Sequence, residues 1–318
     1  MVMIGANIDD ARIDGDLNRL HRYLENYDNM GLQCVEIPPH GMDVIKNGSI
    51  DEKRLAAVKD LLDIFDFKYS VHAPEPLNLM DRDNPALHLE VFRASLDFAE
   101  EIGADTLVYH AGRFYAEVDF PPLYKPSMSE DHKNKLLDLE AYALQRLADD
   151  YEDTYICIEN PHPYLIRSPY CYAERIDLLK EQVLKVNREN VMVSLDIGRM
   201  HMASKFYGFN SVEAAKNIRD MIGHVHVHDN FGESVYHYEK RQTRQIPFGR
   251  GDSHMPIGMG SAPIREVLST FIEQYNGALI LELKDRYYDE LNESIGVLDG
   301  IVSTLLYGEC EKGSPSTI

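Results

Sequence analysis

The chain has 318 residues, of which 44% are hydrophobic, and a formal net charge of −21 at pH 7. This apolar share is enough for a sizeable core, which excludes a disordered chain, a collagen-like repeat and a disulfide scaffold. The excess of negative charge disfavours nucleic acid as a partner, because it repels phosphate backbones.

Eight short apolar runs, rich in β-branched and aromatic residues, predict eight strands along the chain. They are Met3–Ile8, Gln33–Ile37, Tyr69–Ala73, Thr106–Ala111, Tyr155–Asn160, Met192–Ile197, His224–Asp229 and Ala278–Lys284. Segments with helical spacing separate and follow them. These are Asp16–Met30, Asp51–Phe65, Pro85–Ile102, Lys135–Tyr151, Ala173–Val186, Ser211–Met221, Pro263–Tyr275 and Ser294–Tyr307.

Strand and helix alternate eight times, which predicts right-handed βαβ units and a parallel sheet that closes into a single (β/α)₈ TIM barrel. We expect the barrel to span residues 1–308 and residues 309–318 to form a short flexible tail. A doubly wound open sheet is the alternative, but no G-x-G-x-x-G turn follows an early strand.

Three long connections follow strands four, five and seven, at Gly112–Asn134, Pro161–Tyr172 and Asn230–Gly260. Each lies between a strand and the next helix, which places it at the C-terminal mouth of the barrel, where this fold carries its chemistry. We therefore expect these loops to cover the site as lids.

Four widely spaced cysteines form no C-x-x-C pair, so neither a zinc ribbon nor a redox pair is expected. No apolar run approaches the roughly 18 residues of a membrane span, and no signal peptide precedes the first strand. We expect no membrane partner and a cytoplasmic location. A homo-oligomer is compatible with the sequence, although no apolar stripe is reserved for a partner.

Most of the predicted strands end in a residue that can bind a metal. The set comprises His72, His110, Glu159, Asp196, His226 and Glu282. Strand ends meet in a ring around a barrel axis, and carboxylates gathered there need a cation or tight hydrogen bonds. A divalent metal is the simplest explanation, although a single strand-end histidine is often structural.

The seventh strand carries His224, His226 and His228 on one face, because side chains on a strand alternate with a period of two. They lie at different depths, with His224 in the core and His226 as the best ligand. His228 lies either beside the site or at the surface. Glu36 on the second strand either lines the barrel or pairs with a core group.

Seven motifs, taken in order, resemble the xylose-isomerase-like barrel superfamily. They are V-H-A-P, Y-H-A-G, I-E-N-P, L-D-x-G, H-x-H-D-N, D-x-H-x-x-x-G-x-G and L-E-L-K. The superfamily contains sugar phosphate isomerases and epimerases, inosose dehydratases and the endonuclease IV class of apurinic-site (AP) nucleases. The resemblance covers all eight strands and leaves the particular activity open.

The resemblance implies that one divalent ion, Mn²⁺, Zn²⁺, Co²⁺ or Mg²⁺, is bound by four residues. Those residues are Glu159, Asp196, His226 and Glu282. In the nuclease branch, the positions of His72 and His110 carry ligands of a second metal, and those of Asp252 and His254 carry ligands of a third. Here these four residues either bind an additional metal or support the first one.

The sequence departs from the nuclease pattern at Arg199, where the nucleases carry a histidine. A guanidinium has no lone pair to offer a metal, so a complete three-metal site is not expected. Arg199 binds either a substrate phosphate or carboxylate, or Asp252 in a salt bridge. We expect His201, His228 and Lys284 to contact substrate hydroxyl or carboxylate groups.

The function implied is a metal-dependent isomerase or epimerase of a small polyhydroxy carbonyl compound, such as a sugar, a sugar phosphate or a polyol ketone. The metal stabilises an enediolate, while Glu159 and Glu282 remove and return the proton next to the carbonyl. The alternative is an endonuclease IV-like phosphodiesterase, a hydrolase, which the basic stretch Lys240–Arg244 favours and the net charge disfavours. A barrel that has lost its activity is a third hypothesis.

Overall fold

The computed structural model describes residues 2–115, 120, 128–239 and 241–308. Eight parallel strands close into a barrel in the order β1-β10-β9-β8-β7-β6-β5-β2, which confirms the predicted (β/α)₈ fold. The strands are β1 (Met3–Asn7), β2 (Cys34–Ile37), β5 (Lys68–His72), β6 (Thr106–His110), β7 (Tyr155–Glu159), β8 (Val191–Asp196), β9 (Ile222–Val227) and β10 (Ala278–Leu281). The predicted tail at 309–318 lies outside the described residues.

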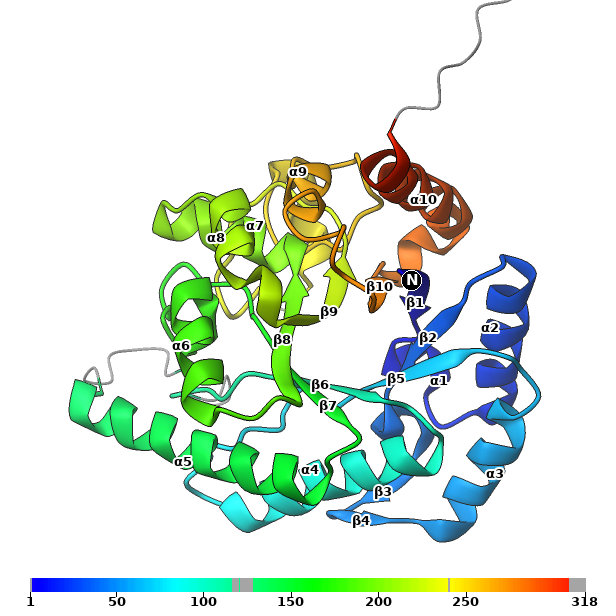
Figure 1. Cartoon of the computed structure of the whole chain (residues 1–318), viewed down its shortest axis with the longest axis horizontal. Coiled ribbons are helices and arrows are strands. Elements are labelled where there is room, and N and C mark those ends of the chain that lie inside the picture. Colours follow the sequence, from blue (N-terminus) through cyan, green and yellow to red (C-terminus); the bar gives the residue numbers. More distant parts are fainter. Residues whose placement is uncertain (1, 116–119, 121–127, 240, 309–318) are drawn as a thin grey trace, which may run out of the picture.

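Helices form the outer layer around the strands (Figure 1). They are α1 (Asp10–Ile13), α2 (Leu17–Asn29), α3 (Glu52–Leu62), α4 (Pro85–Glu101), α5 (Glu130–Asp150), α6 (Ile176–Val186), α7 (Ile197–Tyr207), α8 (Ser211–Ile218), α9 (Ile264–Leu268) and α10 (Leu291–Tyr307). Short 3₁₀ turns are η1 (Pro39–Met42), η3 (Tyr172–Glu174), η4 (Arg219–Met221), η5 (Gln242–Phe248) and η6 (Asp285–Glu290). Among the described residues, no helix is long and apolar enough to cross a membrane.

Most barrel strands are apolar over most of their length because both faces of a parallel sheet are covered. In β6, for example, only the terminal His110 is not fully buried. The parallel register aligns the polar strand ends, since His110 pairs with Glu159 and Asp196 pairs with His226. Residues far apart in sequence therefore meet at one level of the barrel.

Two predicted helices differ most in their bounds from the structure. The helix predicted from Lys135 begins at Glu130, because the Ser129 side chain caps it by accepting a hydrogen bond from the His132 N–H. The helix predicted over 263–275 is helical only at Ile264–Leu268. There, the hydroxyls of Ser269 and Thr270 bond to backbone carbonyls of the preceding turn, which competes with helix propagation.

An α-helix and a β-hairpin are among the elements that were not predicted. The strand expected at Met192–Ile197 ends at Asp196, and α7 begins directly after it. The hairpin of β3 (Ile45–Lys46) and β4 (Ser49–Ile50) turns through Asn47 and Gly48, both with positive φ, as Asn-Gly turns require. The Asn-Gly dipeptide was the signal for it.

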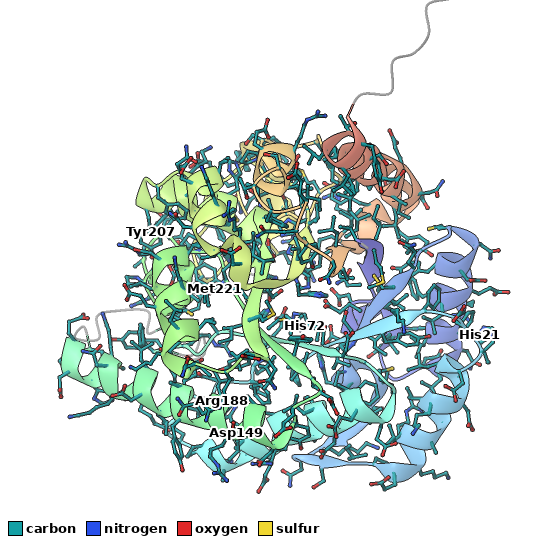
Figure 2. All side chains as sticks on the ribbon, viewed as in Figure 1. His21, His72, Asp149, Arg188, Tyr207 and Met221 are labelled. Atoms are coloured by element: carbon teal, nitrogen blue, oxygen red, sulfur yellow. The ribbon has the colours of Figure 1, made fainter. Side chains whose placement is uncertain are left out.

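Polar side chains fill the mouth end of the barrel interior. Glu36, Glu159, Asp196, His224 and His226 are each no more than 1% exposed. Figure 2 shows His72 near the middle of the ring of strands and His21 at the outer edge of the molecule. A buried polar layer of this kind needs internal partners, and these partners define the site.

Candidate metal centre and active-site pocket

The structure brings the four predicted metal ligands together. Glu159 ends β7, Asp196 ends β8, His226 lies in β9 and Glu282 directly follows β10. One ligand atom from each of them lies within 4.8 Å of those of the other three. Three carboxylates and an imidazole at this spacing are a suitable donor set for a divalent transition metal.

His226 is held from both sides of its ring. Its Nδ1 lies 2.6 Å from Glu159 Oε1 and 3.5 Å from Glu282 Oε2. Its Nε2 lies 2.9 Å from Glu36 Oε1, and Glu36 Oε2 lies 2.9 Å from His224 Nε2. Glu36 therefore pairs with two buried histidines. Its contact with Nε2 fixes the His226 ring so that Nδ1 faces the cluster.

His72 and His110 form a second group with Glu159. His110 Nε2 lies 2.7 Å from Glu159 Oε2, and His72 Nε2 lies 3.6 Å from the same oxygen. The two imidazole rings meet edge to face, with centroids 5.0 Å apart. Both histidines lie beside the first cluster, so they have the geometry either to support it or to bind a further cation.

Asp252 and His254 reach the site from the loop after β9. Asp252 Oδ2 lies 3.0 Å from His254 Nε2, and His254 Nδ1 lies 2.8 Å from the carbonyl oxygen of Glu282. The His254 ring stacks on His228 with centroids 3.8 Å apart. His254 has a φ of 44°, an uncommon backbone conformation for a residue with a side chain.

Arg199 lies among the carboxylates of the cluster and is 5% exposed. Its Nη1 lies 2.9 Å from Glu159 Oε1, and its Nε lies 3.2 Å from Asp196 Oδ2 and 3.3 Å from Asp252 Oδ2. Its Nη2 lies 3.8 Å from Glu282 Oε1. The structure thus contains the salt bridge to Asp252, and it extends that bridge to three more carboxylates.

The start of α7 explains how Arg199 reaches this place. Asp196 is the N-cap of α7, and its Oδ1 accepts a hydrogen bond from the backbone N–H of Arg199 at 2.7 Å. Gly198 lies between them, against the His228 ring, where an added Cβ would lie 2.2 Å from Cε1. Only glycine permits this close approach, which accounts for the glycine of the L-D-x-G motif.

Two asparagines of the motifs bind the backbone of neighbouring segments. Asn160 exchanges two hydrogen bonds with the backbone of Asp196, at 2.9 and 3.0 Å. Asn230 Nδ2 donates to the carbonyl of Gly198 at 2.9 Å. These contacts fix the ends of adjacent strands, so both residues shape the site without lining it.

Asp229 anchors the end of the long loop after β9. Its carboxylate accepts hydrogen bonds from the N–H groups of Gly258, Gly260 and Ala262, each at 2.9 Å. A Cβ at Gly260 would lie 2.4 Å from Asp229 Oδ1. The G-x-G part of the sequence motif therefore serves the fold of this loop.

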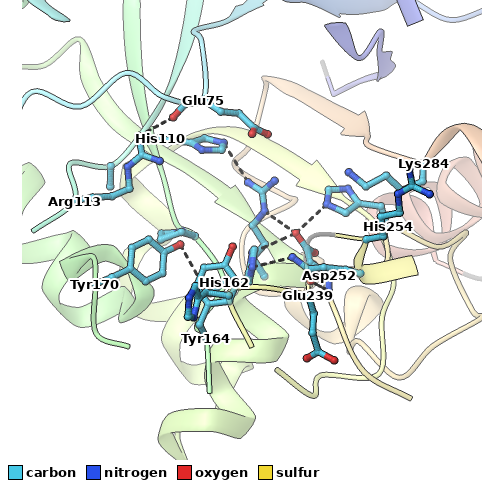
Figure 3. A pocket seen from close by; sticks show the side chains of 16 residues that line it. Glu75, His110, Arg113, His162, Tyr164, Tyr170, Glu239, Asp252, His254 and Lys284 are labelled. Carbon is cyan, nitrogen blue, oxygen red and sulfur yellow. Dashed lines mark hydrogen bonds and ion pairs between the residues drawn. The ribbon is translucent and has the colours of Figure 1, made fainter. Parts of the chain in front are cut away.

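A pocket of about 440 Å³ opens above the cluster (Figure 3). All three long loops contribute to its wall in their described parts. The lining residues are Glu75, His110, Ala111, Arg113, Pro161, His162, Tyr164, Tyr170, Arg199, His237, Glu239, Arg241, Gln242, Asp252, His254 and Lys284. This arrangement agrees with the predicted position of the site at the mouth of the barrel.

The four predicted substrate-binding residues divide into two pairs. Arg199 and Lys284 line the pocket. His201 and His228 do not: His201 Nε2 lies 3.1 Å from Ser261 Oγ, and His228 is fully buried behind His254 with its Nε2 near Asp196. The alternative that placed His228 at the surface is wrong, because its ring packs on Gly198.

Burial and charge act in opposite directions on the histidines of the site. Burial disfavours protonation of His72, but the neighbouring carboxylates of Glu159 and Glu36 outweigh it and raise the pKa of His72 to about 9. Burial is likewise outweighed by Asp196 at His228, whose pKa is about 9. The pKa of His226 is also raised, because Glu36 and Glu159 outweigh burial.

Neighbouring positive charges lower the pKa of carboxylates in the site. Burial disfavours ionisation of Glu159, but the charges of Arg199, His110 and His226 hold its pKa well below the ordinary value. Burial is also outweighed at Asp252, where the neighbouring His254 keeps the pKa low. The site is therefore a set of ionised carboxylates that attract positive charge.

The donor set fits a bound cation. Glu282 Oε2 is buried and accepts no hydrogen bond from any residue that the structure describes. Its nearest side-chain nitrogens are His226 Nδ1 at 3.5 Å and His254 Nδ1 at 3.6 Å. A buried carboxylate oxygen without a donor is costly unless a cation or a water molecule satisfies it.

Three of the pocket residues that sequence reasoning did not single out come from the loop after β7. The Nδ1 atom of His162 lies 3.4 Å from Asp252 Oδ2. Tyr164 and Tyr170 line the same wall. The signal was their place in the loop after β7, which follows the strand that ends in Glu159.

Fold and site together define a (β/α)₈ barrel with a carboxylate and imidazole centre at its C-terminal mouth. The sequence profile of the xylose isomerase-like TIM barrel family matches residues 24–300, and the chain belongs to this family. Two uncharacterised proteins of Methanocaldococcus jannaschii are similar in sequence. One is 26% identical over 241 residues, which cover 74% of this chain and 71% of its own length. The other is 23% identical over 280 residues, which cover 85% of this chain and 89% of its own length.

Solved structures with the same fold include a D-tagatose 3-epimerase-like protein, with a TM-score of 0.70 and 21% identity over 95% of this chain and 98% of that one. An L-ribulose 3-epimerase has a TM-score of 0.65 and is 13% identical, with 96% of each chain covered. The 3-keto-D-glucoside 4-epimerase of E. coli has a TM-score of 0.64 and is 14% identical, with 94% of this chain and 100% of that chain covered. At these identities the likeness shows the fold.

Proposed function

We propose that this protein is a divalent-metal-dependent isomerase or epimerase of a small sugar, sugar phosphate or polyol ketone. The observation that carries the proposal is the convergence of Glu159, Asp196, His226 and Glu282 within 4.8 Å of one another below a pocket of about 440 Å³. A pocket of this volume suits a small molecule. Similarity of fold to epimerases of ketoses supports a sugar as the substrate.

The four residues would hold one ion, with Mn²⁺, Zn²⁺, Co²⁺ and Mg²⁺ as candidates. When bound, a divalent cation polarises the substrate carbonyl and offsets the negative charge of an enediolate. The chain itself supplies carboxylates from two strands of the barrel, Glu159 at the end of β7 and Glu282 directly after β10. One removes the proton next to the carbonyl, and the other returns it.

The pocket wall orients the substrate. Lys284 projects into the pocket, and its ammonium forms no ion pair with any described residue. Arg113 donates from Nη2 to the carbonyl oxygens of Glu75 and Leu77, at 2.8 and 3.1 Å, which fixes its guanidinium at the rim. These cations suit the hydroxyl and phosphate groups of a sugar, while Tyr164 and Tyr170 help exclude water.

The proposal is tested first by metal analysis. Protein purified without chelator or histidine tag should contain about one equivalent of metal, measured by inductively coupled plasma mass spectrometry. Glu282→Gln should lose it, because one of the four donors is weakened, and His110→Ala should keep it. If the wild-type protein binds no metal under any loading condition, the proposed mechanism is refuted.

A second test detects proton transfer without knowledge of the product. Ketoses and sugar phosphates are incubated with the metal-loaded protein in D₂O, and NMR follows deuterium incorporation at the carbon next to the carbonyl. Glu159→Gln should abolish exchange. Glu239→Gln, which changes the same pocket away from the cluster, is the matched control and should retain it. Absence of exchange with every substrate would favour the non-catalytic barrel.

One observation favours the phosphodiesterase alternative. His72, His110 and Glu159 form a second group with ligand spacing, as expected for a centre with more than one metal. Two or more equivalents of metal, reduced by His110→Ala, together with cleavage of DNA at an abasic site, would establish the hydrolase instead.

A further inference from the structure

Carboxylates outnumber the permanent cations in the barrel mouth. The buried cluster contains Glu36, Glu159, Asp196, Asp252 and Glu282, whose side chains are at most 13% exposed. Arg199 is the guanidinium among them. Buried charges without counter-charges are costly, so this excess of negative charge demands further positive charge.

The oxygens of the cluster face two directions. Four carboxylate oxygens are directed to Arg199 at 2.9 to 3.8 Å: Glu159 Oε1, Asp196 Oδ2, Asp252 Oδ2 and Glu282 Oε1. The second oxygen of Glu282 is directed to His226 Nδ1 instead, at 3.5 Å. One side of the cluster is thus neutralised by the chain, and the other side offers donors for an ion.

We propose that Arg199 is a built-in second cation of this centre, and that it restricts the cluster to one divalent ion. The inference rests on the proposed metal centre. A guanidinium is always charged and has no lone pair, so it replaces the charge of an ion without being able to ligate one. Its backbone is fixed by the Asp196 cap of α7, which places the charge there permanently.

Removal of this charge should create a second metal site. His228, His254 and Glu282 each offer an atom within 4.8 Å of the others, next to the side of the cluster that Arg199 now neutralises. Asp252 lies 3.0 Å from His254 and would lose its guanidinium partner. The carboxylates and imidazoles left behind are suitable ligands for Mn²⁺ or Zn²⁺.

The experiment is equilibrium dialysis of chelator-treated protein against Mn²⁺ and, separately, Zn²⁺. The wild-type chain should bind about one equivalent, and Arg199→Gln, which is neutral and polar, should bind about two. Arg199→Lys retains the charge and should bind about one. The melting temperature of metal-free Arg199→Gln should be below that of the wild type, and it should rise more on addition of metal.

Two further variants serve as controls. The Arg113 guanidinium lies in the same pocket but contacts backbone carbonyls and not the cluster. The metal content of Arg113→Gln should therefore match the wild type. If Arg199→Gln does not fold, the double variant Arg199→Gln/Asp252→Asn removes one charge of each sign. It should fold and bind one equivalent if charge balance limits the number of ions.

The outcomes separate this inference from the proposed function. One equivalent in both the wild type and Arg199→Gln, with equal metal-free melting temperatures, overturns the role of Arg199 and leaves the proposed function in place. No metal in the wild type and one equivalent in Arg199→Gln refutes the proposed function and also overturns the limit of one ion, because Arg199 would then exclude every ion. No metal in either protein overturns both.

Discussion

Replacement of Glu36 by Gln should weaken binding of a divalent metal at the barrel mouth by about 10-fold to 100-fold. Glu36 does not line the pocket. It acts through His226, whose Nε2 lies 2.9 Å from Glu36 Oε1. For His226 to offer Nδ1 to a metal, its Nε2 must carry the proton, and the Glu36 carboxylate is the ion-pair partner on that side of the ring. The carboxylate fixes the tautomer and makes the imidazole a better ligand.

The expected magnitude follows from this contact. Loss of the negative charge behind a ligating histidine corresponds to about 1.4 to 2.7 kcal/mol of binding free energy, the equivalent of a 10-fold to 100-fold change. Gln has nearly the shape of Glu, so the packing around a residue that is 1% exposed is preserved. The effect should therefore come from charge.

The assay is competition with a chromophoric chelator, which gives the metal Kd of each variant. Ser70→Ala is the matched control: Ser70 Oγ donates to Glu36 Oε2 at 3.3 Å, so the change disturbs Glu36 but leaves its contact with His226. It should change the Kd much less than Glu36→Gln does. A folded Glu36→Gln protein with a Kd within about twofold of the wild type would refute the reasoning.

Three predictions concern stability. Burial raises the pKa of Glu140 above its ordinary 4.5, so its contribution to folding is complete below that pH and is lost as pH rises through the raised value. Denaturant unfolding should therefore show Glu140→Gln gaining stability relative to the wild type as the pH rises above 4.5, and a constant difference would contradict this. Asp51→Ala removes the cap of α3, which accepts from the Arg54 N–H at 3.1 Å, and should cost about 1 kcal/mol in urea unfolding; no loss would argue against the cap. Gly198→Ala should lower the melting temperature, since its Cβ would lie 2.2 Å from the His228 ring, and an unchanged value would show that this ring moves easily.

The sequence by itself determined the architecture and the location of the site. Eight apolar runs of strand length, separated by helical spacing, leave few arrangements other than a closed parallel barrel. Polar residues at the ends of those runs must then gather at one mouth. This is why strand-end residues that include Glu159, Asp196, His226 and Glu282 were expected to meet, whereas the choice of these four as ligands of one ion came from the family resemblance.

Local sequence could not decide the depth and direction of each polar side chain. Asp196 was placed inside a strand that extended to Ile197, but in the structure it caps a helix and turns Arg199 into the cluster. The same helix carries His201 to Ser261, away from the pocket. These positions follow from a helix start directly at the end of a strand, which periodicity does not reveal.

Contacts between distant segments settled the remaining residues. Glu36 is separated from His226 by most of the chain, and only the closure of the barrel brings them to 2.9 Å. His162 meets Asp252 because two long loops pack together over the mouth. The hydrophobic pattern encodes which residues are buried, whereas strand register and loop conformation decide which buried charges become neighbours.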